Sequence, residues 1–335
     1  MSRRTFFRTI AASASLAMVL AAASADRAGA SLPPNAVVAR LHVAPFDYYD
    51  LTGGLGAVWL INNDGYNYTT LRRIDPHTNR VTARHRLDSS AGGFAVGDGS
   101  IWVSMYYDNE LERIDPAGHV TARIAVGLQP YYVHLAFGSV WTSNHHGRSV
   151  SRVNPRTNRV IATLPAGDQH MFRNGPQAMT DDGRYLYIYS SNGRRPFERI
   201  DPRTNHVTTY RAGVNCGDLV AIAGSVWSAN CTNAIKLHQL APDTGTTRHT
   251  ITLPNVPTNP SMTAHRGALW AAFDTSFDDQ TGTASGGTLD KINPTSGAVE
   301  RQLAIGGDAS VVRAAAGDLW VIDNTNGLVT RLHVR

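Results

Sequence analysis

The sequence is poor in several features that commonly mark a function or a compartment. Only two of its 335 residues are cysteines, only Lys236 and Lys291 are lysines, and glutamate occurs at only four positions. After residue 30 no stretch approaches the ~20 consecutive apolar residues that cross a bilayer. We therefore expect no transmembrane segment in the mature chain.

Common catalytic and nucleic-acid signatures are missing as well. The chain has no nucleophile elbow, P-loop, dinucleotide fingerprint or zinc motif, which argues mildly against the common enzyme classes. Its arginines occur singly at alternating positions, as in Arg80, Arg84 and Arg86, and not in blocks. This spacing predicts solvated strand faces and no nucleic-acid partner.

The first 30 residues have the composition of a cleaved signal peptide. The pair Arg3-Arg4 precedes an uncharged, alanine-rich run, and two A-x-A sites follow, ending at Ala25 and Ala30. The start resembles a twin-arginine export signal, and an ordinary secretory signal is the alternative. Because four arginines and one aspartate lie in this segment, its removal lowers the formal net charge from +5 to +2. We expect a secreted or periplasmic protein.

What the sequence does contain is a repeat. Every tryptophan follows a turn rich in small residues and then one apolar residue, and Leu186-Tyr187 fills the one gap in the series. The seven anchors are Trp59, Trp102, Trp141, Tyr187, Trp227, Trp270 and Trp320. They are separated by 43, 39, 46, 40, 43 and 50 residues. A period of about 40–50 residues with short strands is typical of propeller blades.

A second signature follows most anchors. It reads Arg73-Ile74-Asp75-Pro76 in the first copy and keeps Asp or Asn before Pro in most later copies. Asp-Pro and Asn-Pro favour type I turns, and the Asn or Gly that follows can adopt positive φ and return the chain as a hairpin. Apolar and polar residues alternate with period 2, without helical periodicity. The sequence predicts an all-β fold, a single seven-bladed β-propeller over residues 31–335.

The two ends of the mature chain are expected to meet in one blade. The last repeat, from Trp320 to Arg335, stops after a third strand, and residues 37–43 resemble the fourth strands of other repeats at 81–87 and 120–126. The N-terminal strand should therefore complete blade 7. Such a closure removes a free sheet edge and ties the first blade to the last.

Two repeat copies carry a family resemblance. The copies SVWTSNHHGRSVSRVNPRTNRVIATLPAG (139–167) and SIWVSMYYDNELERIDPAGHVTARIAVG (100–127) resemble YVTN/YncE-like propeller repeats of exported bacterial proteins. They are also similar to the repeats of streptogramin B (virginiamycin B) lyase, and the resemblance covers residues 36–335. The first likeness implies a binding protein. The second implies Mg²⁺-assisted opening of a cyclic depsipeptide by a His and a Glu, yet no His–Glu pair stands in the matching position.

The repeat frame places the candidate site at one mouth of the axial channel, where inter-blade connections and the loops after the anchors gather. The catalytic candidates are His134, His145 and His170. The candidate ligand-binding residues are Tyr131, Tyr132, Asn144, His146, Asn230, Arg313 and Asp323. His134 and Arg313 stand out in a register seven residues before each anchor. An unpaired charge near the axis is costly, so Arg313 would need an anion, a carboxylate or water, and it is the strongest indication of an anionic ligand.

Each candidate also has a structural interpretation. Asn144, Asn230 and Asp323 can be turn caps, His145-His146 a solvated loop pair, and His134 a satisfied inner histidine. A metal site would need three or four ligands within reach. We expect Mg²⁺ or Ca²⁺ as a cofactor only if one of the alternative functions applies. The long loop 274–288 could hold Ca²⁺, act as a partial lid or be a mobile excursion.

The two cysteines predict a disulfide. Cys216 and Cys231 lie nearly opposite each other across the hairpin that turns at residues 223–225. Export would place them in an oxidising compartment, and two free thiols are the alternative. In the entropic model such a bond, closing a loop of about fifteen residues, contributes ~3 kcal/mol.

These features favour an exported binding or scaffold protein. It would hold a small polar or anionic ligand, or an extracytoplasmic protein partner, at the loop-rich mouth, and we expect a monomer. The alternative is a streptogramin-lyase-like or other His-assisted lyase or hydrolase, and a quinone-cofactor propeller is a third hypothesis. An acid within hydrogen-bond reach of His134, His145 or His170 would favour an enzyme.

Overall fold

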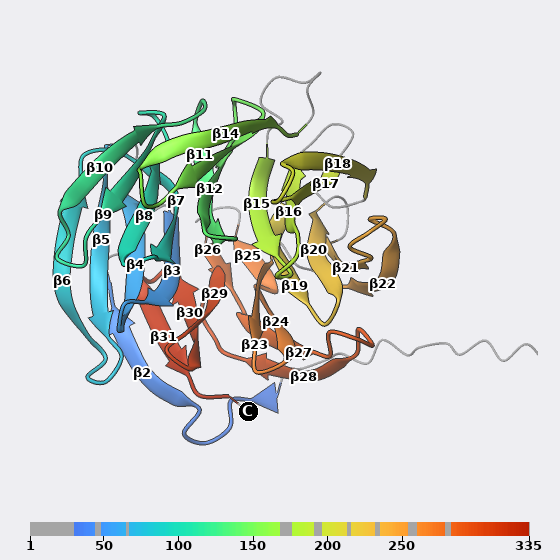
Figure 1. Cartoon of the computed structure of the whole chain (residues 1–335). Helices are drawn as coiled ribbons and strands as arrows, with labels where there is room; N and C mark the ends of the chain where they lie inside the picture. Colours follow the sequence, from blue (N-terminus) through green and yellow to red (C-terminus); the bar gives the residue numbers. More distant parts are fainter. Residues whose placement is uncertain are drawn as a thin grey trace, which may run out of the picture.

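The strands form a ring of seven blades (Figure 1). The computed structural model describes residues 30–43, 48–64, 67–167, 176–190, 196–212, 216–231, 235–253, 260–278 and 283–334. Throughout these ranges the regular elements are strands, without any helix, so no helix there is long and apolar enough to cross a membrane. The predicted all-β, seven-bladed propeller is confirmed.

The first four blades are built in chain order from the axis outward. Blade 1 contains β3 (Tyr48–Gly54), β4 (Ala57–Asp64), β5 (Tyr68–Asp75) and β6 (Arg80–Leu87). Blade 2 contains β7 (Ala91–Gly97), β8 (Ser100–Met105), β9 (Glu110–Ile114) and β10 (Val120–Ala125). Blade 3 contains β11 (Pro130–Ala136), β12 (Ser139–Asn144), β13 (Ser149–Asn154) and β14 (Arg159–Pro165). Blade 4 contains β15 (Pro176–Asp181), β16 (Leu186–Ser190), β17 (Pro196–Asp201) and β18 (His206–Arg211).

The remaining blades carry two additions. Blade 5 contains β19 (Cys216–Ile222), β20 (Ser225–Cys231), β21 (Ile235–Leu240) and β22 (Thr247–Thr252). Blade 6 contains β23 (Ser261–His265), β24 (Ala268–Phe273), β27 (Thr288–Ile292) and β28 (Val299–Ala304), and β1 (Ala30–Ser31) pairs in parallel with its outer strand. Blade 7 contains β29 (Val311–Ala315), β30 (Asp318–Asp323), β31 (Leu328–Leu332) and β2 (Val37–His42).

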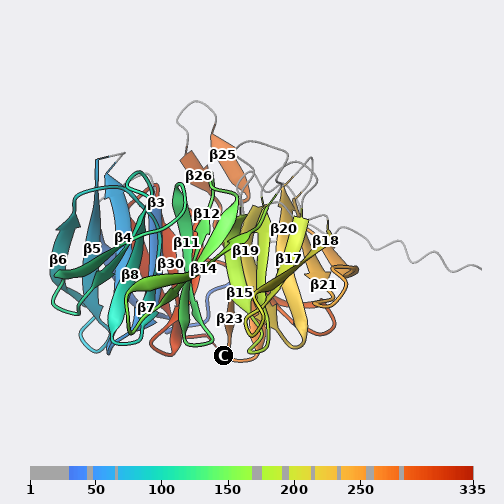
Figure 2. The same cartoon turned by 45° about the horizontal axis from the view of Figure 1, so that its top comes forward.

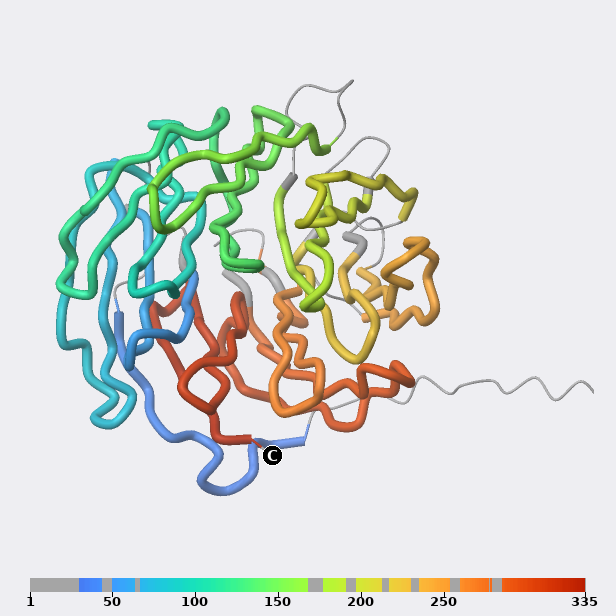
Figure 3. Tube along the Cα trace, viewed as in Figure 1, coloured from blue at the N-terminus to red at the C-terminus, as the bar shows by residue number. Residues whose placement is uncertain are grey.

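The N-terminal strand closes the ring as predicted. β2 pairs antiparallel with β31, from Val37 opposite Leu332 to His42 opposite Leu328. The tube in Figure 3 shows this blue strand lying beside the red C-terminal strands. Leu41 and Val43 join the apolar cluster between blades 7 and 1. The closing blade is thus built from both ends of the chain.

The core lies between blades, and the anchors fill it. Seven clusters of buried side chains are found in the described residues, one between each pair of neighbouring blades. Each anchor packs toward the next blade, as Trp59 packs toward Phe94 of blade 2 and Trp320 toward Leu51 of blade 1. All six tryptophans and Tyr187 are at most 1% exposed. A single blade can therefore bury its two faces only when neighbouring blades pack against it in the ring.

Turn chemistry explains why the strands have these lengths. Six of the turns between the first two strands of a blade are two-residue pairs ending in glycine, and both residues have positive φ, as in Leu55-Gly56 (53° and 70°). Positive φ at both positions defines the type I′ turn, whose twist matches that of the paired strands. In the Asp-Pro turns the aspartate caps the chain, as where the His77 amide donates to Asp75 Oδ1 at 2.8 Å. The predicted positive φ at Asn79, Asn158 and Asn205 is confirmed.

One excursion rises from the loop-rich face. In blade 6 the chain between β24 and β27 forms a small hairpin, with β25 (Ser276–Asp278) antiparallel to β26 (Thr283–Ser285). Figure 2 shows it projecting above the face that also carries the connections between blades. The long loop predicted at residues 274–288 is therefore partly a hairpin. Its first acid, Asp274, is buried and accepts a hydrogen bond from the Ala309 amide at 2.6 Å.

Candidate binding site at the axial mouth

The residues seven positions before the anchors occupy equivalent positions in their blades, because each is paired with its anchor on the adjacent strand. His134 pairs with Trp141, Arg313 with Trp320 and Thr52 with Trp59 on adjacent strands. The same pairing joins Ala95 to Trp102, Thr180 to Tyr187, Val220 to Trp227 and Thr263 to Trp270. Each of these residues lies on the innermost strand of its blade, and the side chains of His134 and Arg313 reach acids on the inner strands of other blades.

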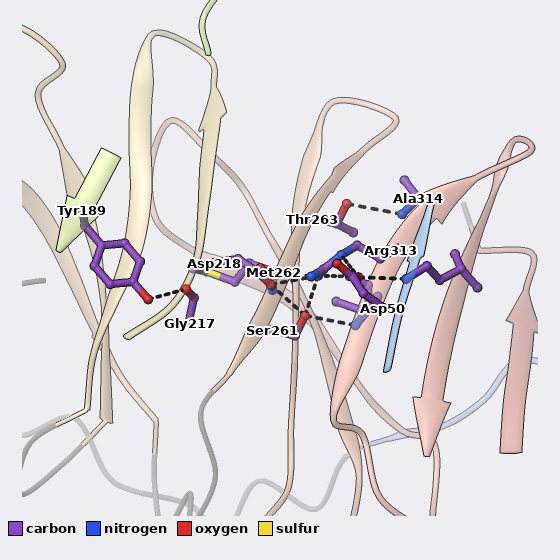
Figure 4. A network of polar contacts seen from close by, with 11 residues as sticks. Asp50, Tyr189, Gly217, Asp218, Ser261, Met262, Thr263, Arg313 and Ala314 are labelled. Atoms are coloured by element: carbon purple, nitrogen blue, oxygen red, sulfur yellow. Dashed lines mark hydrogen bonds and ion pairs between the residues drawn. The ribbon is translucent and has the colours of Figure 1, made fainter. Parts of the chain in front are cut away.

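Arg313 is bound by two carboxylates of the chain itself (Figure 4). Its Nε lies 2.9 Å from Asp50 Oδ1 in blade 1. Its Nη1 donates to Asp218 Oδ2 of blade 5 at 2.9 Å, to Ser261 Oγ of blade 6 at 2.8 Å and to the Val312 carbonyl oxygen at 2.9 Å. Its Nη2 donates to Asp218 Oδ1 at 3.1 Å. Four blades thus meet at one guanidinium.

These two ion pairs change the interpretation of the charge on Arg313. The sequence left an anionic ligand, an internal carboxylate or water as ways to balance its charge, and the structure supplies two carboxylates. The Arg313 charge therefore no longer calls for an anionic ligand. The three side chains keep contact with solvent, since Arg313 is 20%, Asp218 14% and Asp50 13% exposed.

The surroundings of the triad favour the charged form of Arg313 and disfavour the ionised form of Asp50. Burial raises the pKa of Asp50; the positive charge of Arg313 opposes that rise and the negative charge of Asp218 adds to it. Burial acts to lower the pKa of Arg313, but the charges of Asp218 and Asp50 outweigh it and raise that pKa well above its ordinary value. With one guanidinium and two carboxyl groups, the triad has an excess of acid.

The charges of the triad act on nearby tyrosines. Burial raises the pKa of Tyr132, and Asp218 and Asp50 raise it further against the opposing charge of Arg313. Burial likewise raises the pKa of Tyr131, with added effects of Tyr106, Asp50 and Asp218. The Tyr189 hydroxyl donates to the Gly217 carbonyl oxygen at 2.9 Å, next to Asp218 (Figure 4). Tyr189 is 2% exposed and belongs to the apolar cluster between blades 4 and 5, so its hydroxyl, and not its ring face, lies next to the triad.

An aromatic cluster continues outward from Tyr131 over blades 2 and 3. The Tyr131 ring centroid lies 5.9 Å from that of His145 and 6.3 Å from that of Tyr106. The His145 and His146 rings are 5.1 Å apart, and His146 lies 6.3 Å from Tyr106. The predicted candidates Tyr131, His145 and His146 are therefore brought together.

His134 contacts a carboxylate, as the enzyme hypothesis requires. That carboxylate belongs to a different blade and is distant from His134 in the sequence. Its Nε2 lies 2.8 Å from Asp181 Oδ2, at the end of the inner strand of blade 4. This contact lowers the pKa of Asp181. Both side chains remain accessible, at 23% and 27% exposure. The pair can orient an imidazole toward the channel.

Four other candidates have structural contacts or fall outside the described residues. Asn144 is fully buried; its Nδ2 donates to Ser149 and Ser151, and its Oδ1 accepts from the Gly127 amide. Asp323 accepts two hydrogen bonds from Asn326 and caps its turn. Asn144 therefore has the structural role that was the alternative and offers no ligand-accessible surface, whereas Asp323 caps its turn and also lines a surface pocket with Asp308 and Asn326. His170 and the side chain of Asn230 lie outside the described residues.

Sequence reasoning missed both acids of the triad. Asp50 and Asp218 stand nine residues before Trp59 and Trp227, two residues upstream of the register that contains Arg313. Ser261 has the same spacing from Trp270. A comparison of all repeats at this second inner position would have found two acids and a serine where other blades carry Gly93, Tyr132, Ala178 and Val311. It could not have shown that they share one arginine.

The described residues do not form a metal centre. No group of three or more His, Cys, Asp or Glu side chains there is placed to hold a metal ion. The triad carboxylates are engaged by Arg313, whose charge also opposes a cation of high charge density. The donor set at the axis therefore does not fit a resident Mg²⁺ or Ca²⁺ ion, and no reaction step is assigned to one.

Comparisons with known proteins identify the fold. No family model matches the chain, and no curated protein matches it either. A Kuenenia stuttgartiensis hydrazine synthase structure has a TM-score of 0.66 at 13% identity, covering 88% of this chain and 96% of that chain. A streptogramin B lyase structure has a TM-score of 0.64 at 14% identity, covering 89% and 97%. BamB from Moraxella catarrhalis has a TM-score of 0.58 at 11% identity, covering 89% and 99%. At such identities the likeness shows the β-propeller fold alone, which these proteins use for different functions.

Proposed function

We propose that this protein is an exported, YVTN/YncE-like β-propeller that binds a small polar ligand at the axial mouth. The observation that supports this most is the triad of Asp50, Arg313 and Asp218, partly exposed at the point where four blades meet. Buried ion pairs add little to stability compared with apolar packing, so stability alone does not explain charges at the axis. Clusters of ionisable side chains with perturbed pKa values favour a functional role.

The ligand can be sought directly on the purified protein. Mass spectrometry of small molecules released on denaturation should show a compound retained by the wild type and lost from Asp218→Asn. The matched control is Asp98→Asn, which makes the same change in an exposed turn on the opposite face, where Asn tolerates the positive φ of 50°. Equal retention by both variants would place the ligand elsewhere, and an empty wild type would argue against a tightly bound ligand.

Export is a separate part of the proposal. The charged start, the uncharged run and the two A-x-A sites of residues 1–30 support it. Changing Arg3 and Arg4 to lysine should retain the precursor in the cytoplasm if the twin-arginine route is used, whereas a general secretory signal would still work. Cell fractionation with antibody detection separates these outcomes.

A His-assisted lyase or hydrolase is the second candidate function, and the His134–Asp181 contact favours it. A carboxylate that holds one ring nitrogen of a histidine can orient the other as a general base. Incubation with a cyclic depsipeptide of the streptogramin B type, followed by mass spectrometry, tests for ring opening. Turnover must fall in His134→Ala and Asp181→Asn; unchanged turnover in His134→Ala and His145→Ala would remove these histidines from any reaction.

A further inference from the structure

We infer that a pocket between blades 6 and 7 binds a small apolar amino acid in its zwitterionic form. The pocket is separate from the axial triad, so the inference goes beyond the proposed function. It follows from two buried carboxyl groups and one arginine that line the same cavity and, within the described residues, are not paired with one another.

The pocket has a volume of about 310 Å³. One wall is the connection between β28 and β29, and the other is formed by β30, β31 and β2 of blade 7. Its charged residues are Arg40, Asp308 and Asp323, and its apolar residues are Ile305, Val321, Leu328 and Leu332. This volume lies at the lower end of the range for small-molecule sites, so the pocket fits a compact ligand.

The two aspartates of the pocket are buried but have only neutral partners among the described residues. Asp308 is 4% and Asp323 7% exposed. Asp308 accepts hydrogen bonds from Ser310 Oγ and from the amide and hydroxyl of Thr325, at 3.2 and 3.1 Å. Asp323 accepts from the amide and the Nδ2 of Asn326, both at 2.8 Å. Because a buried charge is costly without a counter-charge, a positive group bound in the pocket would stabilise both acids.

Blade 3 fills the corresponding position with hydrogen bonds of its own. Asn144 and Asp323 each follow their anchor by three residues. The Asn144 Nδ2 donates to Ser149, directly opposite it on the next strand, at 2.9 Å. The residue directly opposite Asp323 is Leu328. An ionised carboxylate has no proton to donate and Leu328 has no polar side-chain atom, so this bond cannot form in blade 7, where both residues line the cavity instead.

Arg40 supplies positive charge on the side of the pocket away from the acids. It lies on β2, two strands from Asp323, and its side chain is exposed. Within the described residues it has no hydrogen bond or ion pair. A guanidinium can hold a carboxylate through two parallel N–H bonds.

An amino acid matches all three parts of this lining. Its carboxylate suits Arg40, its ammonium group suits Asp308 and Asp323, and an apolar side chain would be covered by the apolar residues of the pocket. A simple anion would leave the two acids without a counter-charge, and a simple cation would leave Arg40 without a partner. The zwitterion is therefore the ligand class that the pocket favours.

Matched probes test this directly. L-leucine, 3-methylbutan-1-amine and 4-methylpentanoate share an apolar body; the amine lacks the carboxylate and the acid lacks the ammonium group. All three keep their charges at pH 7. Binding is measured by calorimetry and, for weak probes, by ligand-observed NMR. We expect L-leucine to bind with a dissociation constant below about 1 mM, at least about tenfold more tightly than either singly charged probe.

Variants assign the binding to this pocket. Arg40→Gln should weaken L-leucine binding at least about tenfold and leave binding of the amine unchanged, whereas Asp323→Asn should weaken both. The matched controls are Arg84→Gln, on the exposed outer strand of blade 1, and Asp98→Asn, and neither should change L-leucine binding. Arg40→Gln keeps the result interpretable if Asp323→Asn fails to fold, as judged by circular dichroism.

Three outcomes would overturn the inference: no binding of L-leucine, equal or tighter binding of a singly charged probe, and L-leucine binding that survives both pocket variants. Each would leave the proposed axial site standing, because that site is tested separately by the compound that the wild type retains and Asp218→Asn loses.

Discussion

At the scale of single residues, Asp218 joins three blades at the axial site. Its carboxylate accepts from Arg313, from Ser261 Oγ at 2.8 Å and from the Met262 amide at 2.9 Å. It therefore links blades 5, 6 and 7. Its charge also adds to the effect of burial in raising the pKa of Tyr132.

Replacing Asp218 by Asn should destabilise the fold by about 2–3 kcal/mol, because Arg313 loses one of two counter-charges in a largely buried place. Urea unfolding at pH 7 measures the loss. In the double variant with Arg313→Met the cost should be smaller than the sum of the two single costs by at least about 1 kcal/mol, since both charges are removed together. Strictly additive costs would show that the two charges are not coupled.

Glu198 provides a test of pH dependence. It is 3% exposed and accepts from the Gly167 amide at 2.8 Å and from Thr209 Oγ1 at 3.3 Å. Burial raises its pKa to about 7. Because the folded pKa lies above the unfolded value near 4.5, the folded state holds a proton that the unfolded chain has lost. The contribution of Glu198 to stability is therefore fully present below about pH 4.5 and declines as the pH rises toward 7.

Glu198→Gln should remove this decline. Relative to the wild type, the variant should gain stability between about pH 5 and pH 8, by up to ~3 kcal/mol, because the glutamine stays neutral. Urea unfolding at several pH values gives the difference. Glu300→Gln is the control, since hydrogen bonds from Asn293 and Lys291 lower the pKa of Glu300 and move its titration below this window. A parallel pH profile for wild type and Glu198→Gln would contradict the assignment.

At the scale of elements, arginines in the third strands link one blade to the next. Arg152 Nη1 donates to the Pro202 carbonyl oxygen at 2.6 Å and to Asn205 Oδ1 at 2.9 Å in the turn of blade 4. Its guanidinium also lies 4.8 Å from the ring centroid of Trp141. Arg113 and Arg331 make the same link to the turns of blades 3 and 1. These arginines of the repeat are inter-blade contacts and not only solvated surface residues.

Arg152→Ala should therefore cost about 2 kcal/mol in thermal or urea unfolding, through two lost hydrogen bonds to the next blade and a lost cation–π contact. Arg156, an exposed arginine in the turn of the same blade, is the matched control, and its alanine variant should stay within about 0.5 kcal/mol of the wild type. Similar costs for both variants would mean that the link adds nothing beyond a surface charge.

The cysteine pairing stays a prediction at this scale. β19 begins at Cys216 and β20 ends at Cys231, but an irregular register places Cys216 opposite Ala229, so the cysteines are offset by two residues. Their side chains lie outside the described residues. The exported protein should nonetheless have a mass lower by two hydrogens before reduction, and Cys216→Ser should lose about 3 kcal/mol of stability. Two alkylatable thiols in the native, unreduced protein would show that the bond does not form.

At the scale of the whole molecule, ring closure through β2 should dominate stability. Leu41 is 7% exposed within the cluster between blades 7 and 1, whereas Val38 of the same strand is 43% exposed. Leu41→Asp should cost at least about 3 kcal/mol, because it buries a charge at the seam, and Val38→Asp should be nearly neutral. The unfolding midpoints of these two variants give the comparison. If they were equally stable, β2 would not be needed to close the ring.

Much of this architecture could be predicted from local patterns. The anchors recur at blade spacing, the X-Gly and Asp-Pro turns fix the hairpins, and the strand at residues 37–43 resembles the fourth strands that it replaces. These signals are local because period-2 alternation and positive φ depend on neighbouring residues. The register of His134 and Arg313 could be predicted for the same reason, since it counts back from the anchors.

The site could be predicted only in part. Asn144 and Asp323 follow their anchors as loop residues of a mouth should, yet their side chains turn into the fold and bond within it. The partners of Arg313 and His134 come from other blades, and Arg313 and Asp218 are 95 residues apart in the chain. No repeat pattern states which inner residues of different blades approach one another.

The sequence by itself determined the number of blades, the turns between their strands and the closure of the ring, because each depends on hydrogen bonding and burial within a short stretch of chain. Only the tertiary structure decided that Arg313 is paired with Asp50 and Asp218 and that His134 meets Asp181. That outcome depends on how far each side chain reaches across the axis from its own blade, which is a property of the closed ring and not of any single repeat.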